Sequence, residues 1–306
     1  MNNNNVLSTF DGLSGGQIAL TKLGIQYNKY YASEIDKPAI KVAQYNFPNT
    51  IQLGDVRNID GTVLQDIKLL MGGSPCQSFS FMGKRKGMTT NENVEITDLE
   101  TYLSMKSNGF EFQGQSYLFW EFVRLLKETK AKYFLLENVV MSSKWEHVIT
   151  RALGVEPIKI NSARVSAQNR ERIYWTNIPN ITIPEDKGIM LTDVIPGAVA
   201  AGKRGRKLKG DNHYSYPLTT RTDGKSNCIV TATSNTGFYI KDGEYLPYTP
   251  EQAEVLQTLD KGYTDVPGVS KTNRLHMIGN GWTIDVIQHL FTGLISKKNK
   301  YQLYFR

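Results

Sequence analysis

Short apolar runs alternate with amphipathic stretches along the chain from about residue 5 to residue 180. The short runs are rich in apolar residues, which favours strands, and they cover residues 6–10, 30–33, 51–53, 69–71 and 133–136. The longer stretches place apolar residues at helical spacing, and they cover residues 17–23, 37–46 and 117–129. Because strands and helices alternate, the pattern predicts an α/β fold, with a parallel sheet and helices on both faces.

The texture of the chain changes in its second half. Residues 186–248 are rich in Gly, Thr, Asn, Lys and Tyr, and they favour a smaller, irregular, β-rich domain. Helical patterns return over residues 250–259 and 282–295. We therefore predict one domain built from residues 1–185 and 263–306, and a second domain over residues 186–262.

Composition narrows the class of protein. The chain has 306 residues, of which 40% are hydrophobic and 21% charged, as in ordinary globular proteins. No apolar run approaches the roughly 20 residues that span a bilayer, and the polar first residues give no signal peptide, so we expect no membrane association. The two cysteines, Cys76 and Cys228, cannot build a disulfide framework, which favours a reducing, cytoplasmic location. The four histidines are scattered, so we expect no metal site.

The formal net charge of +7 makes a polyanionic partner such as nucleic acid plausible. Basic residues gather in two clusters, residues 84–86 and 203–209. A solvated surface loop is the plain alternative for each cluster taken alone.

Cys76 follows a proline at the end of an apolar run, in Gly73-Ser74-Pro75-Cys76-Gln77. Proline fixes its own φ and removes a donor, so the turn holds one shape and presents the thiol at a strand end. This context makes Cys76 a candidate nucleophile, whereas a small buried side chain is the alternative. The long polar segment that follows, residues 78–115, shows little periodicity and is typical of a functional loop.

Three strand ends carry the chemistry of a nucleoside site. Phe10–Gly16 lies between a strand and a helix, where glycines let a ligand approach the backbone. Glu34 ends the next strand, where a carboxylate suits ribose hydroxyls, and Asp55 ends the third. The loop departs from G-x-G-x-x-G, so a nucleoside without pyrophosphate fits better than a dinucleotide. An ordinary tight turn is the alternative for the glycines alone.

Two further motifs offer acid and guanidinium groups. Glu137-Asn138 ends a strand after apolar residues, and a carboxyl there is suited to proton donation, although a helix-start carboxylate is the alternative. Arg170 and Arg172 lie two apart in Gln168–Arg172, which predicts two guanidiniums on one side of an extended segment. A surface ion-pair ladder is the alternative.

These motifs, in this order, resemble those of the cytosine-5 DNA methyltransferases over about residues 6 to 296. The texture around residues 6–34 and 263–279 looks most like the animal de novo branch of that family. Two departures stand out. Ser8 replaces a commonly acidic residue, and Thr258-Leu259-Asp260 replaces an expected Gly-Phe-Pro segment. The segment proposed for target recognition matches weakly.

The resemblance implies a Rossmann-like, S-adenosylmethionine-dependent methyltransferase fold with a mixed sheet, joined to a target-recognition domain at 186–262. It implies S-adenosyl-L-methionine as methyl donor, S-adenosyl-L-homocysteine as product, and double-stranded DNA as partner. Its donor-binding positions match Phe10, Gly12, Leu13, Gly15, Glu34, Ile35, Asp55, Val56, Pro75 and Asn280. Its catalytic positions match Cys76, Glu137, Arg170 and Arg172. Expected DNA contacts are Ser80, Lys84, Arg85, Lys86, Lys203, Arg204, Arg206, Lys207 and Arg221.

The mechanism that the resemblance implies is addition of Cys76 to carbon 6 of a flipped cytosine, which makes carbon 5 nucleophilic. Glu137 would contact ring nitrogen 3, and Arg172 the carbonyl oxygen. Three alternatives remain open at this point: a tRNA cytosine-5 methyltransferase, a non-catalytic DNA-binding homologue, and a thymidylate-synthase-like enzyme. A prokaryotic or phage setting, such as restriction-modification, is the expected context; the target sequence and the oligomeric state are not predicted.

Overall fold

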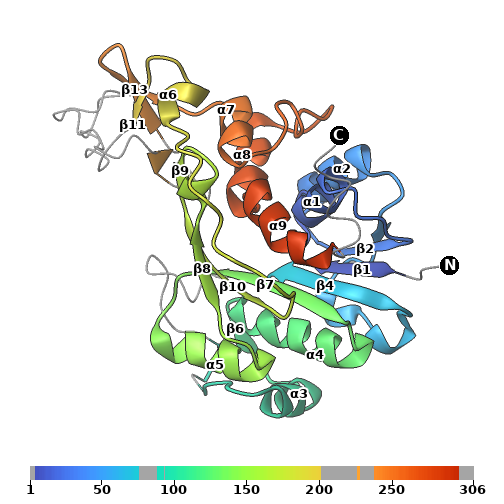
Figure 1. Cartoon of the computed structure of the whole chain (residues 1–306). Helices are drawn as coiled ribbons and strands as arrows, with labels where there is room; N and C mark the ends of the chain where they lie inside the picture. Colours follow the sequence, from blue (N-terminus) through green and yellow to red (C-terminus); the bar gives the residue numbers. More distant parts are fainter. Residues whose placement is uncertain (1–3, 76–87, 93, 201–225, 228–237, 296–306) are drawn as a thin grey trace.

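Seven strands form the central sheet, in the order β3-β2-β1-β4-β7-β10-β8 (Figure 1). The structure is a computed structural model, and it describes residues 4–75, 88–92, 94–200, 226–227 and 238–295. The strands of this sheet are β1 (Asn5–Thr9), β2 (Tyr30–Ser33), β3 (Ile51–Gln52), β4 (Ile67–Gly73), β7 (Tyr133–Val139), β8 (Ile158–Asn161) and β10 (Glu171–Thr176).

The sheet is mixed, because one strand runs against its neighbours. β1 pairs in parallel with β2 and β4, and β4 pairs in parallel with β7. β10 is antiparallel to both β7 and β8. The expected α/β fold with a mixed sheet is therefore confirmed. The hydrophobic pattern alone predicted only parallel strands, because it carries no information on strand direction.

Helices cover both faces of the sheet (Figure 1). The face with α4 and α5 also carries α3, and the other face carries α1, α2, α8 and α9. The helices are α1 (Gly15–Lys22), α2 (Lys37–Asn46), α3 (Leu99–Ser107), α4 (Phe119–Thr129), α5 (Ser143–Leu153), α6 (Leu191–Val194), α7 (Pro250–Leu256), α8 (Lys271–Asn280) and α9 (Ile284–Phe291). Short 3-10 turns lie at Val56–Asn58, Gly61–Val63, Ser116–Leu118, Ser162–Arg164 and Thr292–Leu294.

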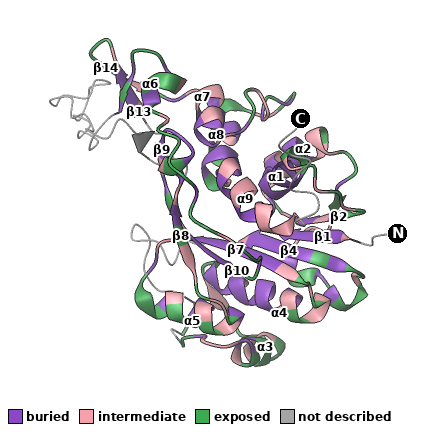
Figure 2. Cartoon of the chain, in the orientation of Figure 1, coloured by how far each residue is buried: buried purple, intermediate pink, exposed green. Residues whose placement is uncertain are grey.

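The core lies on both sides of the sheet. Adjacent residues of one strand belong to different apolar clusters: Leu69 packs with the α1 side, and Leu70 packs with the α4 side. Leu135 and Leu136 divide in the same way. Successive side chains of a strand point to opposite faces, so these strands are buried on both faces, as Figure 2 shows for the sheet centre.

Part of the segment predicted as a long loop is regular structure. Residues 99–107 form α3, whose N-cap Asp98 accepts a hydrogen bond from the Thr101 amide at 2.8 Å. A two-stranded sheet of β5 (Thr89–Thr90) and β6 (Phe112–Gln113) flanks it. α3 has only two buried residues, Leu99 and Tyr102, so it lacks the apolar periodicity on which the prediction relied. The loop prediction is wrong here.

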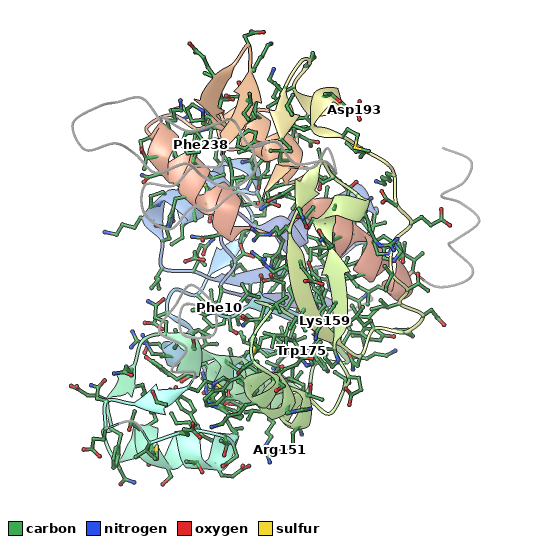
Figure 3. All side chains as sticks on the ribbon, turned by 90° about the vertical axis from the view of Figure 1, so that its left-hand side faces the viewer. Phe10, Arg151, Lys159, Trp175, Asp193 and Phe238 are labelled. Carbon is green, nitrogen blue, oxygen red and sulfur yellow. The ribbon has the colours of Figure 1, made fainter. Side chains whose placement is uncertain are left out.

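A small β region stands beyond the sheet. β11 (Val199–Ala200), β13 (Phe238–Lys241) and β14 (Glu244–Pro247) form a three-stranded sheet. Figure 3 labels Asp193 and Phe238 there, at the opposite end of the molecule from Arg151 on α5. A parallel pair of β12 (Ser226–Asn227) with β9 (Gln168–Asn169) joins this half of the chain to the segment before β10. α7 packs against α8. The predicted division at residues 186 and 262 stays a prediction.

In the described parts of the chain, no helix is long and apolar enough to cross a membrane. The same residues include no group of three or more His, Cys, Asp or Glu side chains placed to hold a metal ion.

Candidate active site

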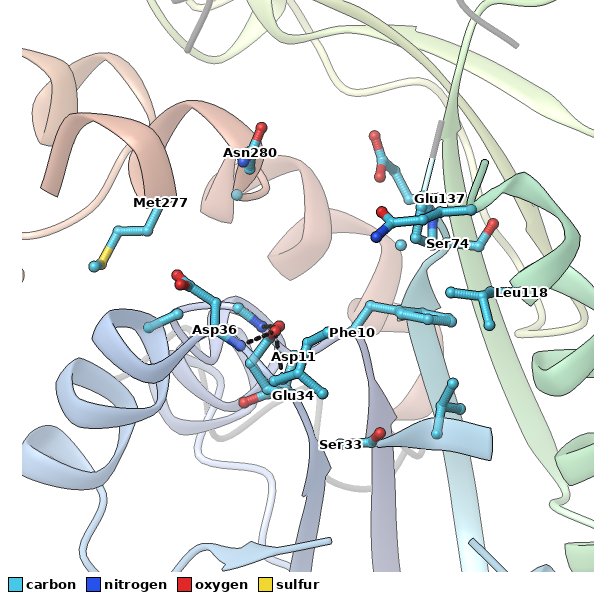
Figure 4. A pocket seen from close by; sticks show the side chains of 18 of the residues that line it. Phe10, Asp11, Ser33, Glu34, Asp36, Ser74, Leu118, Glu137, Met277 and Asn280 are labelled. Carbon is cyan, nitrogen blue, oxygen red and sulfur yellow. Dashed lines mark hydrogen bonds between the residues drawn. The ribbon is translucent and has the colours of Figure 1, made fainter. Parts of the chain in front are cut away.

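A cavity of about 510 Å³ lies at the carboxyl ends of the parallel strands. β1 is the central strand here, because the chain runs outward from it to β2 and β3 and then returns to β4 on its other side. In an open α/β sheet, such a switch in strand order opens a crevice that receives the ligand. Figure 4 shows Glu34 and Asp36 at one end of this cavity and Glu137 with Ser74 at the other.

The turn from β1 to α1 forms one wall. Three of its residues have left-handed backbones: Phe10 at φ 55°, Gly12 at φ 57° and Ser14 at φ 67°. A Cβ on Gly12 would meet nothing within 4 Å, so glycine is favoured there by conformation and not by crowding. The hydroxyl of Tyr263 donates to the carbonyl oxygen of Leu13 at 2.9 Å and ties the turn to the C-terminal part of the chain.

Glu34 is held at the end of β2 by backbone amides. Its Oε2 accepts from the Gly12 amide at 2.8 Å, and its Oε1 accepts from the amides of Ile35 and Asp36 at 2.7 and 2.9 Å. Oε2 therefore keeps a free lone pair for a hydroxyl donor. The side chain beside it, Ile35, is 64% exposed and lines the cavity, which leaves an apolar surface for a ring.

Asp55 lines the same cavity from the segment that follows β3. Both of its carboxylate oxygens accept from the Arg57 Nε at 3.0 Å, and Oδ1 also accepts from the Arg57 amide at 3.0 Å. The hydrogen bonds from the Arg57 side chain hold the pKa of Asp55 below its ordinary value. The carboxylate is thus charged and oriented at the cavity edge.

Asp11 is buried beneath the turn. Its Oδ1 accepts from the Tyr30 hydroxyl at 2.7 Å, and its Oδ2 has no hydrogen-bond partner among the described residues. Burial raises the pKa of Asp11 to about 6, against the lowering effect of nearby hydroxyls. This carboxyl was not singled out from the sequence.

Glu137 receives a donor on each carboxylate oxygen. The Arg172 Nε is 3.0 Å from Oε1, and the Trp282 Nε1 donates to Oε2 at 3.1 Å. Glu137 is paired with Gly73 across β4 and β7, and only 8% of it is exposed. The sheet geometry explains the Arg172 contact, because Arg172 lies opposite Val139, two residues from Glu137 on the same face.

Arg170 does not share the partner of Arg172. It lies between β9 and β10, where the alternation of a strand does not apply. Its Nη1 donates to the Gly279 carbonyl at 3.0 Å, and its Nη2 donates to the Gly281 carbonyl at 2.9 Å. Arg170 therefore fastens the turn at the end of α8, whereas Arg172 pairs with Glu137, and both side chains line the cavity.

All ten residues predicted to bind the methyl donor line this one cavity, from Phe10 to Asn280. Glu137, Arg170 and Arg172 line it as well. Pro75 lines it, whereas Cys76, the next residue in the sequence, lies outside the described residues. The predicted DNA contacts Ser80, Lys84, Arg85, Lys86, Lys203, Arg204, Arg206, Lys207 and Arg221 also lie outside them.

Several residues that line the cavity were not predicted from the sequence. Gly114 and Gln115 come from the end of the segment expected to be a functional loop, and Tyr117 and Leu118 come from the start of the helix predicted over 117–129; all four line the cavity with Phe10. Trp282 was assigned to the first turn of a helix over 282–295, but α9 begins at Ile284. The tryptophan directly after Gly279-Asn280-Gly281 was the available signal, because that turn was already expected at the site.

The cavity offers acceptors and apolar surface of the kind that S-adenosyl-L-methionine needs. Glu34 offers an acceptor for ribose hydroxyls, and Ile35 and Val56 offer apolar surface for an adenine ring. No Gly-rich pyrophosphate cradle is required for this ligand.

The sheet with its reversed strand, and the cavity at the switch in strand order, are those of the Rossmann-like fold that the motifs implied. The structure of a DNMT2 mutant from Spodoptera frugiperda matches with a TM-score of 0.66 and 16% identity, over 96% of this chain and 100% of that one. The Entamoeba histolytica methyltransferase EhMeth matches with a TM-score of 0.61 and 16% identity, over 97% and 100%. At this identity, both show the fold alone.

Residues 4–185 match the model of the C-5 cytosine-specific DNA methylase family, and the chain belongs to that family. The orphan methyltransferase M.Rho11sI of Bacillus phage rho11s is 32% identical over 200 residues, 60% of this chain and 35% of that protein. M.SPRI of Bacillus phage SPR is 33% identical over 188 residues, 56% of this chain and 37% of that protein. The aligned part thus spans little more than a third of the length of either relative.

A third relative, the orphan methyltransferase M.SPBetaI of Bacillus phage SPbeta, is 26% identical over 310 residues, 89% of this chain and 68% of that protein. These curated relatives come from phages. They support the family that the motifs indicated, but they do not support the expected likeness to the animal de novo branch.

Proposed function

We propose that the protein transfers a methyl group from S-adenosyl-L-methionine to carbon 5 of cytosine in double-stranded DNA. The observation that carries this proposal is the continuous cavity at the switch in strand order. One end holds Glu34, with its backbone amide donors, and the other end holds the Glu137–Arg172 pair beside Pro75. A donor site and a base site in contact are what a direct methyl transfer requires.

The roles follow from the chemistry of cytosine, whose carbon 5 is a poor nucleophile. Addition of the Cys76 thiolate to carbon 6 makes carbon 5 enamine-like, so that carbon 5 can take the methyl group and leave S-adenosyl-L-homocysteine as the product. A base then removes the carbon 5 proton, and elimination of the thiolate from carbon 6 restores the aromatic ring. Glu137 contacts ring nitrogen 3, and Arg172 holds the carbonyl oxygen while it gains negative charge. When bound, S-adenosyl-L-methionine supplies the methyl group on an electrophilic sulfonium.

Access to the base requires extrusion from the duplex, at a cost of a few kcal/mol. We propose that Ser80, Lys84, Arg85 and Lys86 contact DNA near the flipped base. Lys203, Arg204, Arg206, Lys207 and Arg221 would contact DNA from the target-recognition segment. Phosphate contacts make affinity fall with salt, so neutralising residues 203–209 should reduce the salt slope of binding. An unchanged slope would place that cluster away from DNA.

The decisive experiment pairs two cysteine variants. Cys76→Ala should still bind the methyl donor but lose methyl transfer, and it should form no covalent adduct with a 5-fluorocytosine duplex. Cys228→Ala is the matched control, because it removes the second of the two cysteines in the chain. Transfer by Cys76→Ala near the wild-type rate would overturn the proposal, and loss of transfer in both variants would point to misfolding instead.

The nucleic acid is tested in the same assay. Transfer to duplex DNA and not to tRNA is the expected result, and the reverse would favour the RNA-modifying alternative. All three relatives above carry the name orphan methyltransferase, and a similar setting without a partner nuclease, inside a reducing compartment, is our proposal for this chain. Single-base sequencing of methylated DNA from producing cells would give the target sequence.

A further inference from the structure

The indole of Trp282 contacts the carboxylate that the proposed function places at the cytosine ring. Its Nε1 donates to Glu137 Oε2 at 3.1 Å, from a turn 145 residues further along the chain. We infer that Trp282 is a positioning residue that fixes the orientation of the Glu137 carboxylate. This inference rests on the proposed function and adds a residue that acts through Glu137.

Two donors fix the plane of this carboxylate. The terminal torsion of a glutamate is broad, so packing alone sets it poorly. Here Arg172 occupies Oε1 at 3.0 Å and Trp282 occupies Oε2 at 3.1 Å, so rotation about this torsion would break both contacts. The side chain of Arg172 is 16% exposed and that of Glu137 is 11% exposed. With little water available to replace it, the indole N–H decides where Oε2 lies.

Glycines from two motifs provide the space for the indole. A Cβ on Gly73 would stand 3.0 Å from the Trp282 Nε1 and 3.0 Å from Glu137 Oε2. A Cβ on Gly16 would stand 3.4 Å from the indole Cζ3, and one on Gly15 would stand 3.8 Å from the Trp282 Cβ. The glycines that the sequence suggested for ligand approach thus also make room for the indole.

The turn that carries Trp282 is braced on both sides. Before it, the Gly281 carbonyl accepts from Arg170 Nη2 at 2.9 Å and from Gln257 Nε2 at 3.2 Å. After it, the hydroxyl of Thr283 donates to Gln257 Oε1 at 2.7 Å and bonds the Ser162 hydroxyl at 2.8 Å. A rigid aromatic side chain on a braced turn holds its hydrogen bond in a fixed place, as a positioning group requires.

The same turn lines the donor end of the cavity through Asn280 and Gly281. The support of Glu137 therefore comes from the part of the chain predicted to contact the methyl donor. For this reason a variant of Trp282 needs two measurements: the rate of transfer at saturating methyl donor, and the affinity for the donor. Only the rate reports on Glu137.

The test is a double-mutant cycle in single-turnover methyl transfer at saturating donor. Trp282→Phe keeps an aromatic ring and removes the N–H, and it should slow transfer about ten- to a hundred-fold, as loss of a hydrogen bond to a charged group does. In a Glu137→Gln background the same change should alter the rate by less than about twofold, because its partner is already altered. Donor affinity measured by calorimetry should change by less than about threefold.

Trp175→Phe is the matched control. The Trp175 indole donates to the Thr150 hydroxyl at 2.9 Å, on α5 and away from the cavity lining, so the same chemical change there should leave transfer unaltered. If Trp282→Phe lowers the melting temperature, replacement of Trp282 by benzothienylalanine is the second variant, because it removes only the N–H and keeps the shape of the ring system.

The outcomes distinguish the positioning role of Trp282 from the proposed function. Equal slowing by Trp282→Phe in both backgrounds, or a loss confined to donor affinity, would overturn the positioning role and leave the proposed function intact. Absence of transfer by the wild-type protein, or Glu137→Gln at the wild-type rate, would overturn the proposed function itself.

Discussion

The side-chain amide of Asn138 donates to both the carbonyl and the hydroxyl oxygen of Ser74, at 3.2 and 3.0 Å. Asn138 is 1% exposed and Ser74 is 4% exposed, so neither group can turn to water instead. The contact joins β7 to the turn that leaves β4 toward Pro75. In the Glu-Asn-Val motif, the asparagine thus fixes the backbone that leads to the proposed nucleophile, while the glutamate faces the cavity.

We predict that Asn138→Ala slows methyl transfer about tenfold or more, because two buried acceptors lose their donor and the turn is released. The dissociation constant of the methyl donor, measured by calorimetry, should stay near that of the wild type. Ser74→Ala is the control, because it removes the hydroxyl and keeps the carbonyl acceptor, and its effect should be smaller. Equal effects from both variants would argue that the hydroxyl alone matters.

Substitution of two neighbouring glycines of β4 by alanine should have different effects, one on stability and the other on methyl transfer. A Cβ on Gly72 would overlap Thr9 Oγ1 and stand 2.9 Å from the Thr9 carbonyl oxygen, whereas a Cβ on Gly73 would press on Glu137 and Trp282. We expect Gly72→Ala to destabilise the fold by about 1–3 kcal/mol, the usual cost of overpacking, and to keep the specific activity of the folded fraction. Gly73→Ala should keep most of the stability and lose transfer. Urea unfolding and single-turnover rates separate them, and similar profiles for the two variants would contradict this assignment.

Substitution of the two arginines of the Gln168–Arg172 segment should also have different effects on stability and on the rate of transfer. Arg170 is 4% exposed and donates to two backbone carbonyls, a geometry that one lysine ammonium reproduces poorly. Arg170→Lys should lower both the melting temperature and the donor affinity. Arg172→Lys should lower the rate of transfer with a smaller change in melting temperature, because Arg172 is more exposed and pairs with Glu137. A rate loss confined to Arg170→Lys would contradict these roles.

Asp11 should make stability depend on pH in an unusual direction. Burial raises its pKa to about 6 from an ordinary 3.8, so the folded protein keeps a proton that the unfolded chain releases in this interval. The free energy of unfolding should therefore fall as pH rises from 4 to 6, by about 3 kcal/mol at most. Asp11→Asn can still accept from Tyr30 and should remove this fall, so that it is more stable than the wild type above pH 6 and no more stable below pH 4. Urea unfolding of both proteins across this range is the measurement, and parallel curves would contradict the assignment.

Residues at strand ends were predictable, and contacts brought from a distance were not. Phe10 and Glu34 directly follow β1 and β2, Asp55 and Pro75 lie in the turns that leave β3 and β4, and Glu137 lies near the end of β7. Parallel strands end at the same edge of a sheet, so sequence order alone gathers these residues at one crevice.

Trp282 lies at no strand end, and its place directly after Asn280 and Gly281 was a weak signal, because an apolar residue before an apolar helix fits helix packing equally well. Arg170 was expected to support Arg172 at the site, but its bonds to the carbonyls of Gly279 and Gly281 could not be predicted from the sequence. α3 was missed because only Leu99 and Tyr102, near its N-terminal end, are buried, so the sequence shows no apolar periodicity. In each case the deciding contact came from tertiary structure, which periodicity does not record.

The short parallel pair between Ser226–Asn227 and Gln168–Asn169 sets a condition on any exchange of the segment between residues 186 and 262. The strand it joins runs directly into Arg170 and then into β10. A graft from a relative with another specificity would need to carry a strand of matching register. A chimera without that strand would lose the pairing that precedes Arg170, and we expect Arg170 and Arg172 to be displaced from the cavity.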